Sequence, residues 1–137
     1  MPNKIFAGPA DVTGALLNEG TADAAILPGQ LVVNTATGFA VSGATGEVLV
    51  ALEYGAHVDD KGGVDVAYDE GELVIAAAPR SGEFYWVRAA AATYAKGALL
   101  EKAATGRVAA LASGVAQFVV EQGATVTAGQ LLLVRKI

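Results

Sequence analysis

The sequence predicts an all-β fold, a compact antiparallel β-barrel or sandwich made of short hairpins. Three observations favour this class. Glycine-containing turns recur at roughly ten-residue spacing, which is typical of all-β domains. The runs between them are rich in β-branched and aromatic residues, which fit a pleated sheet. In addition, a stretch that begins near residue 29 recurs 68 positions later without a gap.

One short sequence motif appears five times in the chain. It is a glycine, then an acid or its amide, then an unbroken apolar run. Glycine supplies the positive φ of a tight turn, the polar residue leaves the turn, and the apolar run enters a sheet. The copies begin at Gly29, Gly46, Gly71, Gly82 and Gly129. From the positions of these turns and of the apolar runs between them, we expect strands at 31–34, 39–42, 47–54, 64–67, 72–78, 83–88, 98–102, 107–111, 115–121 and 130–136.

An internal quasi-repeat relates residues 29–56 to residues 97–124. Matches under the 68-residue shift include Gly29 with Gly97 and Thr37-Gly38 with Thr105-Gly106. The repeat also indicates the secondary structure of the alanine-rich stretch 88–104, for which propensity alone would favour a helix. Its counterpart is β-branched and ends in a Thr-Gly turn, so we predict a strand at 98–102 and a hairpin turn at 103–106. A short helix around 89–95 stays open.

The first 25 residues differ from the rest and predict an extended N-terminal arm before a single domain at 26–137. Prolines and glycines interrupt this segment, and its apolar residues are scattered. Such a segment is poorly ordered alone and needs a neighbour that receives its apolar side chains. The candidate partner-binding residues of the arm are Ile5, Phe6, Val12, Leu16 and Leu17.

Composition favours a chain that is covered by partners. Hydrophobic residues make up 53% and charged residues 17%, with a mean hydropathy of +0.45. Average domains carry roughly 25% charged residues. The excess of apolar surface predicts a homo-oligomer or a large partner surface.

Residues 59–72 account for the net charge of −5, because this stretch contains six acidic residues and a single basic residue, Lys61. We interpret this stretch as a solvated loop and strand edge, with a contact for a basic partner as the alternative. The chain lacks the basic footprint of a nucleic-acid-binding protein. It also lacks the ~18-residue apolar run that a membrane helix needs and the apolar core of a secretory signal.

The sequence offers little catalytic chemistry. There is no cysteine, and His57 is the only histidine. Its repeat counterpart is Thr125, which suits a turn residue better than a general base or a metal ligand. The glycines lack the pattern of a phosphate loop, and nothing selects a pair of carboxylates. We therefore expect no enzymatic activity, no cofactor and no metal.

The densest aromatic segment is the predicted strand 83–88. Alternation places Phe84, Trp86 and Arg88 on one face and Tyr85 and Val87 on the other. We interpret Phe84 and Trp86 as core residues. The alternative is an intersubunit patch that includes Tyr85, Trp86 and Arg88, because these residue types concentrate at interfaces.

Two resemblances suggest functions. Residues 121–134 are similar to half of a biotinyl or lipoyl carrier domain, but neither Lys61 nor Lys136 has the flanking residues of that family's modified lysine. A carrier domain is therefore a minor alternative.

The whole pattern resembles the capsid decoration (cement) proteins of tailed bacteriophages. The resemblance rests on the acidic, cysteine-free composition, the N-terminal arm and four strand motifs, at residues 27–33, 37–41, 82–87 and 129–136. It implies a β-rich module, usually a trimer and sometimes a dimer or monomer, synthesised in the host cytoplasm. On the virion it binds the outside of the major capsid protein lattice and reinforces the shell by bridging its subunits. A tail or fibre component is the alternative. If the arm carries binding, deletion of residues 2–17 should abolish lattice binding and leave the domain folded.

Overall fold

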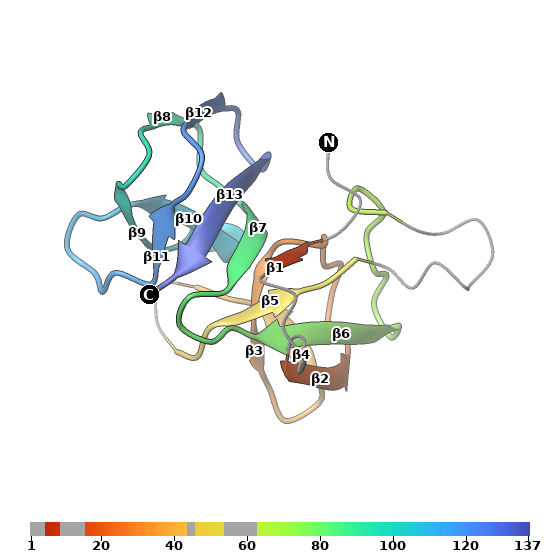
Figure 1. The fold of residues 1–137 in the computed structure, drawn as a ribbon. Coiled ribbons are helices and arrows are strands. Elements are labelled where there is room, and N and C mark those ends of the chain that lie inside the picture. The colour runs from red at the N-terminus through yellow and green to blue at the C-terminus, as the bar shows by residue number, and fades with distance from the viewer. Residues whose placement is uncertain (1–4, 9–15, 44–45, 54–62) are drawn as a thin grey trace.

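The computed structural model describes residues 5–8, 16–43, 46–53 and 63–137, and it confirms the all-β class (Figure 1). The described residues form antiparallel sheets that pack as in a sandwich, and they contain one short 3₁₀ turn. The sheets do not close into a barrel in this part of the chain. Of the two predicted architectures, the sandwich is the one observed.

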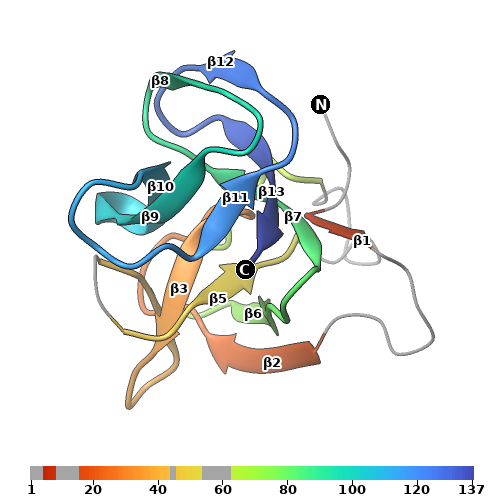
Figure 2. The ribbon, with the colours of Figure 1, turned by 60° about the vertical axis from the view of Figure 1, so that its left-hand side comes forward.

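The first sheet has five strands in the order β2-β6-β5-β3-β4. Their bounds are Leu16–Thr21 (β2), Leu31–Asn34 (β3), Phe39–Val41 (β4), Leu49–Ala51 (β5) and Leu73–Ala78 (β6). Figure 2 shows β2 at the outer edge of this sheet, beyond β6.

The second sheet has six strands in the order β1-β7-β13-β11-β9-β10, and a separate two-stranded ribbon pairs β8 with β12. The bounds are Phe6–Gly8 (β1), Phe84–Arg88 (β7), Ala92–Tyr94 (β8), Leu99–Ala103 (β9), Arg107–Ala110 (β10), Phe118–Val120 (β11), Ala124–Val126 (β12) and Leu131–Lys136 (β13).

The predicted quasi-repeat is present in the sheets. The order β4-β3-β5-β6-β2 of the first sheet matches β10-β9-β11-β13-β7 of the second. Hydrogen bonds repeat with it: the Gly29 N–H donates to the Ala51 carbonyl as the Gly97 N–H donates to the Val120 carbonyl. The parallel bridge between Ala22 and Phe39 likewise has an equivalent between Ala89 and Val108.

The repeat is longer than the sequence indicated. Strand β2 pairs with β6 as β7 pairs with β13, so β2 is the first strand of the first repeat. The predicted division at residue 25 therefore falls inside this repeat, between β2 and β3. Residues 16–21 pair within the chain's own sheet.

The N-terminal segment also joins the sheet. Strand β1 pairs with β7, and the Trp86 N–H donates to the Ile5 carbonyl over 2.8 Å. The Ile5 side chain is completely buried, and Phe6 packs edge-on against Tyr85 with ring centroids 5.2 Å apart. Deletion of residues 2–17 would thus remove part of the core, so the structure no longer predicts a folded product from it.

In the recurring glycine motif, two reciprocal hydrogen bonds join the first and last residues of the turn. The Gln30 N–H donates to the Leu27 carbonyl over 3.0 Å, and the Gln30 side-chain oxygen accepts the Leu27 N–H over 2.8 Å. The same pair of bonds closes the turns 69–72, 80–83 and 127–130 through Glu72, Glu83 and Gln130. The acid or amide after the glycine is therefore part of the turn and fixes where the next strand begins.

Three local predictions can be compared with the structure. The hairpin turn at 103–106 is confirmed, with Ala104–Gly106 in a 3₁₀ turn between β9 and β10. The strand predicted at 64–67 is wrong: this stretch is a turn that leads to Tyr68, whose hydroxyl donates to two carbonyls near the end of β5. Residues 89–95 contain strand β8 and no helix.

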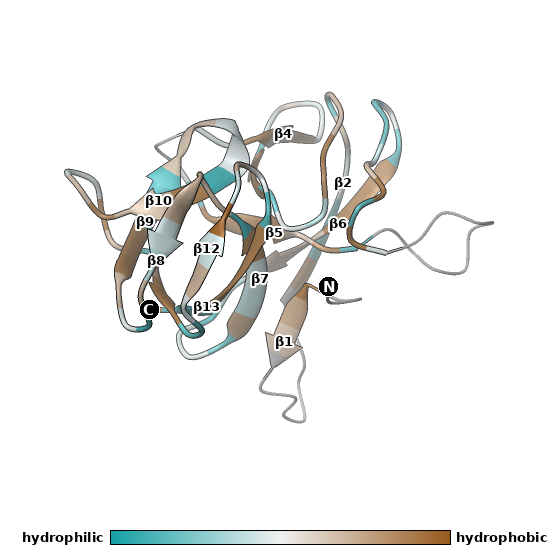
Figure 3. Cartoon of the chain, turned by 90° about the horizontal axis from the view of Figure 1, so that it is seen from above, coloured by the Kyte–Doolittle hydropathy of each residue, from teal (hydrophilic) through white to brown (hydrophobic). Residues whose placement is uncertain are grey.

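Two apolar clusters form the core. The smaller one covers one face of the first sheet with residues such as Ile26, Phe39 and Tyr68. The larger one joins the second sheet to the other face of the first sheet and includes Leu31 and Leu132. Figure 3 shows apolar colouring along the strands and more polar colouring at many of their connections.

The close approach of the two repeats at Gly29 gives a stability prediction. A Cβ at Gly29 would lie 2.6 Å from Leu131 Cδ2, whereas a Cβ at Gly71 would meet nothing within 4 Å. Both glycines have positive φ, at 86° and 88°. Gly71→Ala should cost about 1–2 kcal/mol of unfolding free energy from backbone strain alone. Gly29→Ala should cost a further ~1–3 kcal/mol from overpacking. Equal losses in urea unfolding would contradict this tight contact.

Candidate partner-binding surface

The aromatic strand β7 turns the opposite face inward from the one predicted. Tyr85 and Val87 are completely buried, because they lie opposite the buried residues Val134 and Leu132 of β13. Phe84 and Trp86 are only half-buried on the other face of the sheet. Tyr85 and Val87, instead of Phe84 and Trp86, therefore fill the interior, while the half-buried Trp86 packs against the edge of the larger core cluster.

Arg88 holds the two repeats together and lies in the interior, with only 5% of its surface exposed. Its Nε donates to the Pro28 carbonyl over 2.8 Å, Nη1 donates to the Gly129 carbonyl over 3.1 Å, and Nη2 donates to the Val64 carbonyl. Asp65 accepts a further bond at 3.3 Å. A buried guanidinium needs such partners.

Tyr85 is also an internal residue, and its hydroxyl donates to Glu83 over 3.0 Å. Burial, followed by the neighbouring Glu83, raises the pKa of Tyr85. Of the predicted intersubunit patch of Tyr85, Trp86 and Arg88, only Trp86 thus keeps exposed surface. The placement of Tyr85 and Arg88 on such a patch is corrected, because the chain itself uses both side chains.

Glu83 organises the connection between the repeats. Its carboxylate accepts bonds from the Arg80 N–H at 2.8 Å and from Arg80 Nη2 at 2.6 Å, besides that from Tyr85. Burial alone would raise the pKa of Glu83, but these hydrogen bonds and the Arg80 charge outweigh it and leave the pKa below its usual value.

The first exposed apolar area is an outer face of the second sheet. A row of residues runs from Leu111, just after β10, across β9 and β11 to β13, since Leu99 lies opposite Val119 and hydrogen-bonds to Leu111, and Val119 lies opposite Arg135. Leu99 is 45% exposed and Leu111 38%, whereas Val119 is buried between Leu99 and Arg135. We name these four residues, Leu99, Leu111, Val119 and Arg135, the second-repeat face.

The second exposed apolar area lies at the β2 edge of the first sheet. Leu17 on β2 and Leu73 on β6 are each 59% exposed. Glu19, two residues after Leu17 on β2, is also exposed. β2 pairs with β6 and lies at the edge of the sheet among the described strands, and such an edge is open to pairing with another chain. We name Leu17, Glu19 and Leu73 the first-repeat edge. Of the predicted arm residues, Leu17 belongs to it, Leu16 begins β2, and Val12 lies outside the described residues.

These two areas are suited to protein contacts. Exposed apolar residues that gather on one face are typical of interaction sites. The second-repeat face is bordered by an ion pair in which Arg135 Nε lies 3.3 Å from a Glu121 carboxylate oxygen. The sequence analysis missed Leu73, Leu99 and Leu111. The repeat held a signal for Leu99, because the 68-residue shift pairs it with Leu31.

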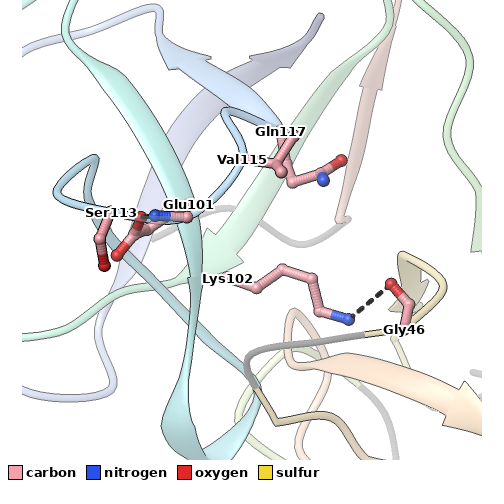
Figure 4. A pocket seen from close by; sticks show the side chains of 7 residues that line it. Gly46, Glu101, Lys102, Ser113, Val115 and Gln117 are labelled. Carbon is pink, nitrogen blue, oxygen red and sulfur yellow. Dashed lines mark hydrogen bonds between the residues drawn. The ribbon is translucent and has the colours of Figure 1, made fainter.

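A shallow pocket of about 380 Å³ lies where the loop after β10 meets β9 (Figure 4). The Glu101 carboxylate accepts the N–H groups of Ala112 and Gly114, and Lys102 Nζ donates to the carbonyls of Gly46 and Glu47. Burial lowers the pKa of Lys102, against an opposing effect of Glu47. The charged groups of this pocket thus hold loops in place.

Other residues considered for chemistry lie elsewhere. Lys136 is within β13, and its Nζ donates to the Ile137 carbonyl, so it is not at a hairpin tip as in a carrier domain. His57 and Lys61 lie outside the described residues, as does the start of the acidic stretch. Within the described ranges, no group of three or more acidic or histidine side chains could hold a metal ion. No helix there could cross a membrane.

The described residues form a two-repeat β protein in which four exposed leucines lie on a sheet face and a sheet edge, while the exposed Val115 and Ile137 lie outside these two areas. No protein-family model matches the chain, and no curated protein matches it. A solved structure, the N base of head fiber gp8.5 in bacteriophage phi29, is similar with a TM-score of 0.55. The match covers 89% of this chain and 93% of that chain at 13% sequence identity. The two proteins share a fold.

The Glu83 network predicts acid sensitivity. Because its folded pKa is depressed, ionised Glu83 stabilises the fold above the unfolded pKa, and this contribution is lost as the pH falls through the folded pKa. Glu83→Gln should lower the unfolding free energy at pH 7 and flatten its decline between pH 5 and pH 2. Urea unfolding across this range measures both. Glu70→Gln, at an exposed position, is the control and should keep the wild-type decline, and an equally steep decline in Glu83→Gln would contradict the assignment.

Proposed function

We propose that this chain is a structural protein of a bacteriophage virion that binds the outer surface of the capsid and bridges major capsid protein subunits. The observation that carries the proposal is the fold shared with a phage head fiber base over 89% of the chain. The resemblance of its sequence motifs to capsid decoration proteins supports the same role.

The surface chemistry is consistent with this proposal. A protein that bridges subunits gains affinity when it binds at several points at once, because the later contacts form within the same complex. Several copies joined to one another would present several points of contact, and the exposed Leu17, Leu73, Leu99 and Leu111 make the chain suited to contacts between proteins. A role without catalysis, cofactor or metal is part of the proposal.

A fibre component is the second candidate. It is favoured by one specific observation, that the similar solved structure is the base of a head fiber. In that role the chain would bind the capsid at fewer places and carry a further fibre. Density at every lattice position in electron microscopy supports decoration, whereas density at isolated positions with a protruding fibre supports the alternative.

Binding to purified shells tests the proposal. The chain should sediment with expanded, emptied shells of the phage that encodes it, at a saturating ratio to the major capsid protein. It should also raise the temperature at which these shells disassemble. Purified tails of the same phage are the matched control and should not retain it. Failure to bind shells, or saturable binding to tails alone, would overturn capsid decoration.

A further inference from the structure

The contact between the two repeats inside the chain uses different surfaces of each repeat. The first repeat contributes the sheet face of Leu31, Val50 and Ala77, all completely buried in the larger core cluster. The second repeat contributes the side formed by β1, β7 and β13. The Arg88 N–H donates to the Gly29 carbonyl over 2.9 Å, and Leu131 approaches Gly29. We name this contact the internal joint.

The strand pairings give each joint residue an equivalent in the other repeat. Val50 lies opposite Ala77 as Val119 lies opposite Arg135. The Leu52 N–H donates to the Ile75 carbonyl as the Glu121 N–H donates to the Leu133 carbonyl. The resulting equivalents of Leu31, Val50 and Ala77 are Leu99, Val119 and Arg135. Those of Phe84, Trp86 and Leu131 are Leu17, Glu19 and Leu73.

Most of these equivalents lie on the surface, and Val119, which is 9% exposed, is the buried exception. The second-repeat face holds the counterparts of the buried residues of the first repeat, and Leu99 is 45% exposed where Leu31 is fully buried. The first-repeat edge holds the counterparts of the β7 and β13 side, and Leu73 is 59% exposed where Leu131 is 9% exposed. The chain therefore contains one complete joint. It also carries an uncovered equivalent of each joint surface, the second-repeat face and the first-repeat edge.

We propose that copies of this chain associate head to tail, with the second-repeat face of one copy packed on the first-repeat edge of the next, as the repeats pack within the chain. The charges support this pairing. Arg135 stands where the internal joint has Ala77, and Glu19 stands where it has Trp86, so the contact between copies would bring opposite charges to facing surfaces. The inference needs only the fold and does not depend on capsid binding.

A contact between two different surfaces has a defined consequence for assembly. It is heterologous, and such contacts form closed rings or open filaments according to the rotation that each contact imposes. A ring of n copies would place twice as many similar repeats in succession. A symmetric dimer, by contrast, would pair like surfaces.

The first experiment compares masses in solution without any capsid. Native mass spectrometry of the wild type should give a multiple of the 13.8 kDa chain mass. Leu99→Asp and Leu73→Asp should each reduce it to the single-chain mass, because each removes one half of the contact. Ala124→Asp on the exposed β12 ribbon is the matched control and should assemble as the wild type does. A monomeric wild type, or assembly of either variant, would overturn the proposal.

The second experiment distinguishes a head-to-tail contact from a symmetric one. An equimolar mixture of Leu99→Asp and Leu73→Asp should form a species of twice the chain mass and none larger, because one intact contact remains between unlike variants. Unfolded variants could not form this species, so a positive result also shows that both are folded. If the wild type assembles and both variants fold by circular dichroism, absence of the mixed dimer would overturn the proposal.

A charge exchange completes the test. Glu19→Arg and Arg135→Glu should each weaken assembly, and the two changes in one chain should restore it. No restoration would contradict the facing of these residues. If instead the wild type is monomeric in solution and both aspartate variants lose shell binding, the two areas bind the capsid, which would overturn association of copies while supporting the proposed function.

Discussion

The structure depends on the contact between its two repeats, in which Arg88 is the central residue. Its guanidinium is buried and donates to carbonyls in the turns before β3 and β13 and at Val64. A buried charge is tolerated only when its donors are satisfied, so these three segments have to stay together. Gly29 permits the approach, since any side chain there would collide with Leu131. The joint thus positions both sheets, and the surfaces that it leaves uncovered are the ones available to partners.

The two repeats differ where their surroundings differ. Some positions that face each repeat's own core stay apolar in both, as with Val74 and its equivalent Leu132. Positions on the outer faces vary with what covers them. Ala77, covered by the second repeat, corresponds to the partly exposed Arg135, and the half-buried Trp86 corresponds to the exposed Glu19. An outer face that nonetheless keeps Leu99 and Leu111, or Leu17 and Leu73, is best explained by a further contact.

The sequence could predict the fold class, the turns and the central part of the repeat, because these depend on local chemistry and constant spacing. The full repeat could not be seen with one shift. The offset is 67 residues from Leu17 to Phe84, 68 from Leu31 to Leu99, and 58 from Leu73 to Leu131. It changes because the segment between β5 and β6, which contains the acidic stretch, is longer than its counterpart. Strands β8 and β12 were missed because short Ala-Thr segments carry no apolar run. The facing of Tyr85 and Arg88 depends on long-range pairing with β13, which no local pattern reveals.

Because the chain has no cysteine, a covalent test of the contact between copies is direct. Cysteines placed at positions 99 and 73 of one chain, treated with a short thiol-specific cross-linker, would report whether these positions meet in different copies. The account predicts a ladder of covalently linked chains from the double variant and single chains from either variant alone. Linked dimers from the position 99 variant alone would show like faces in contact and would contradict the head-to-tail arrangement.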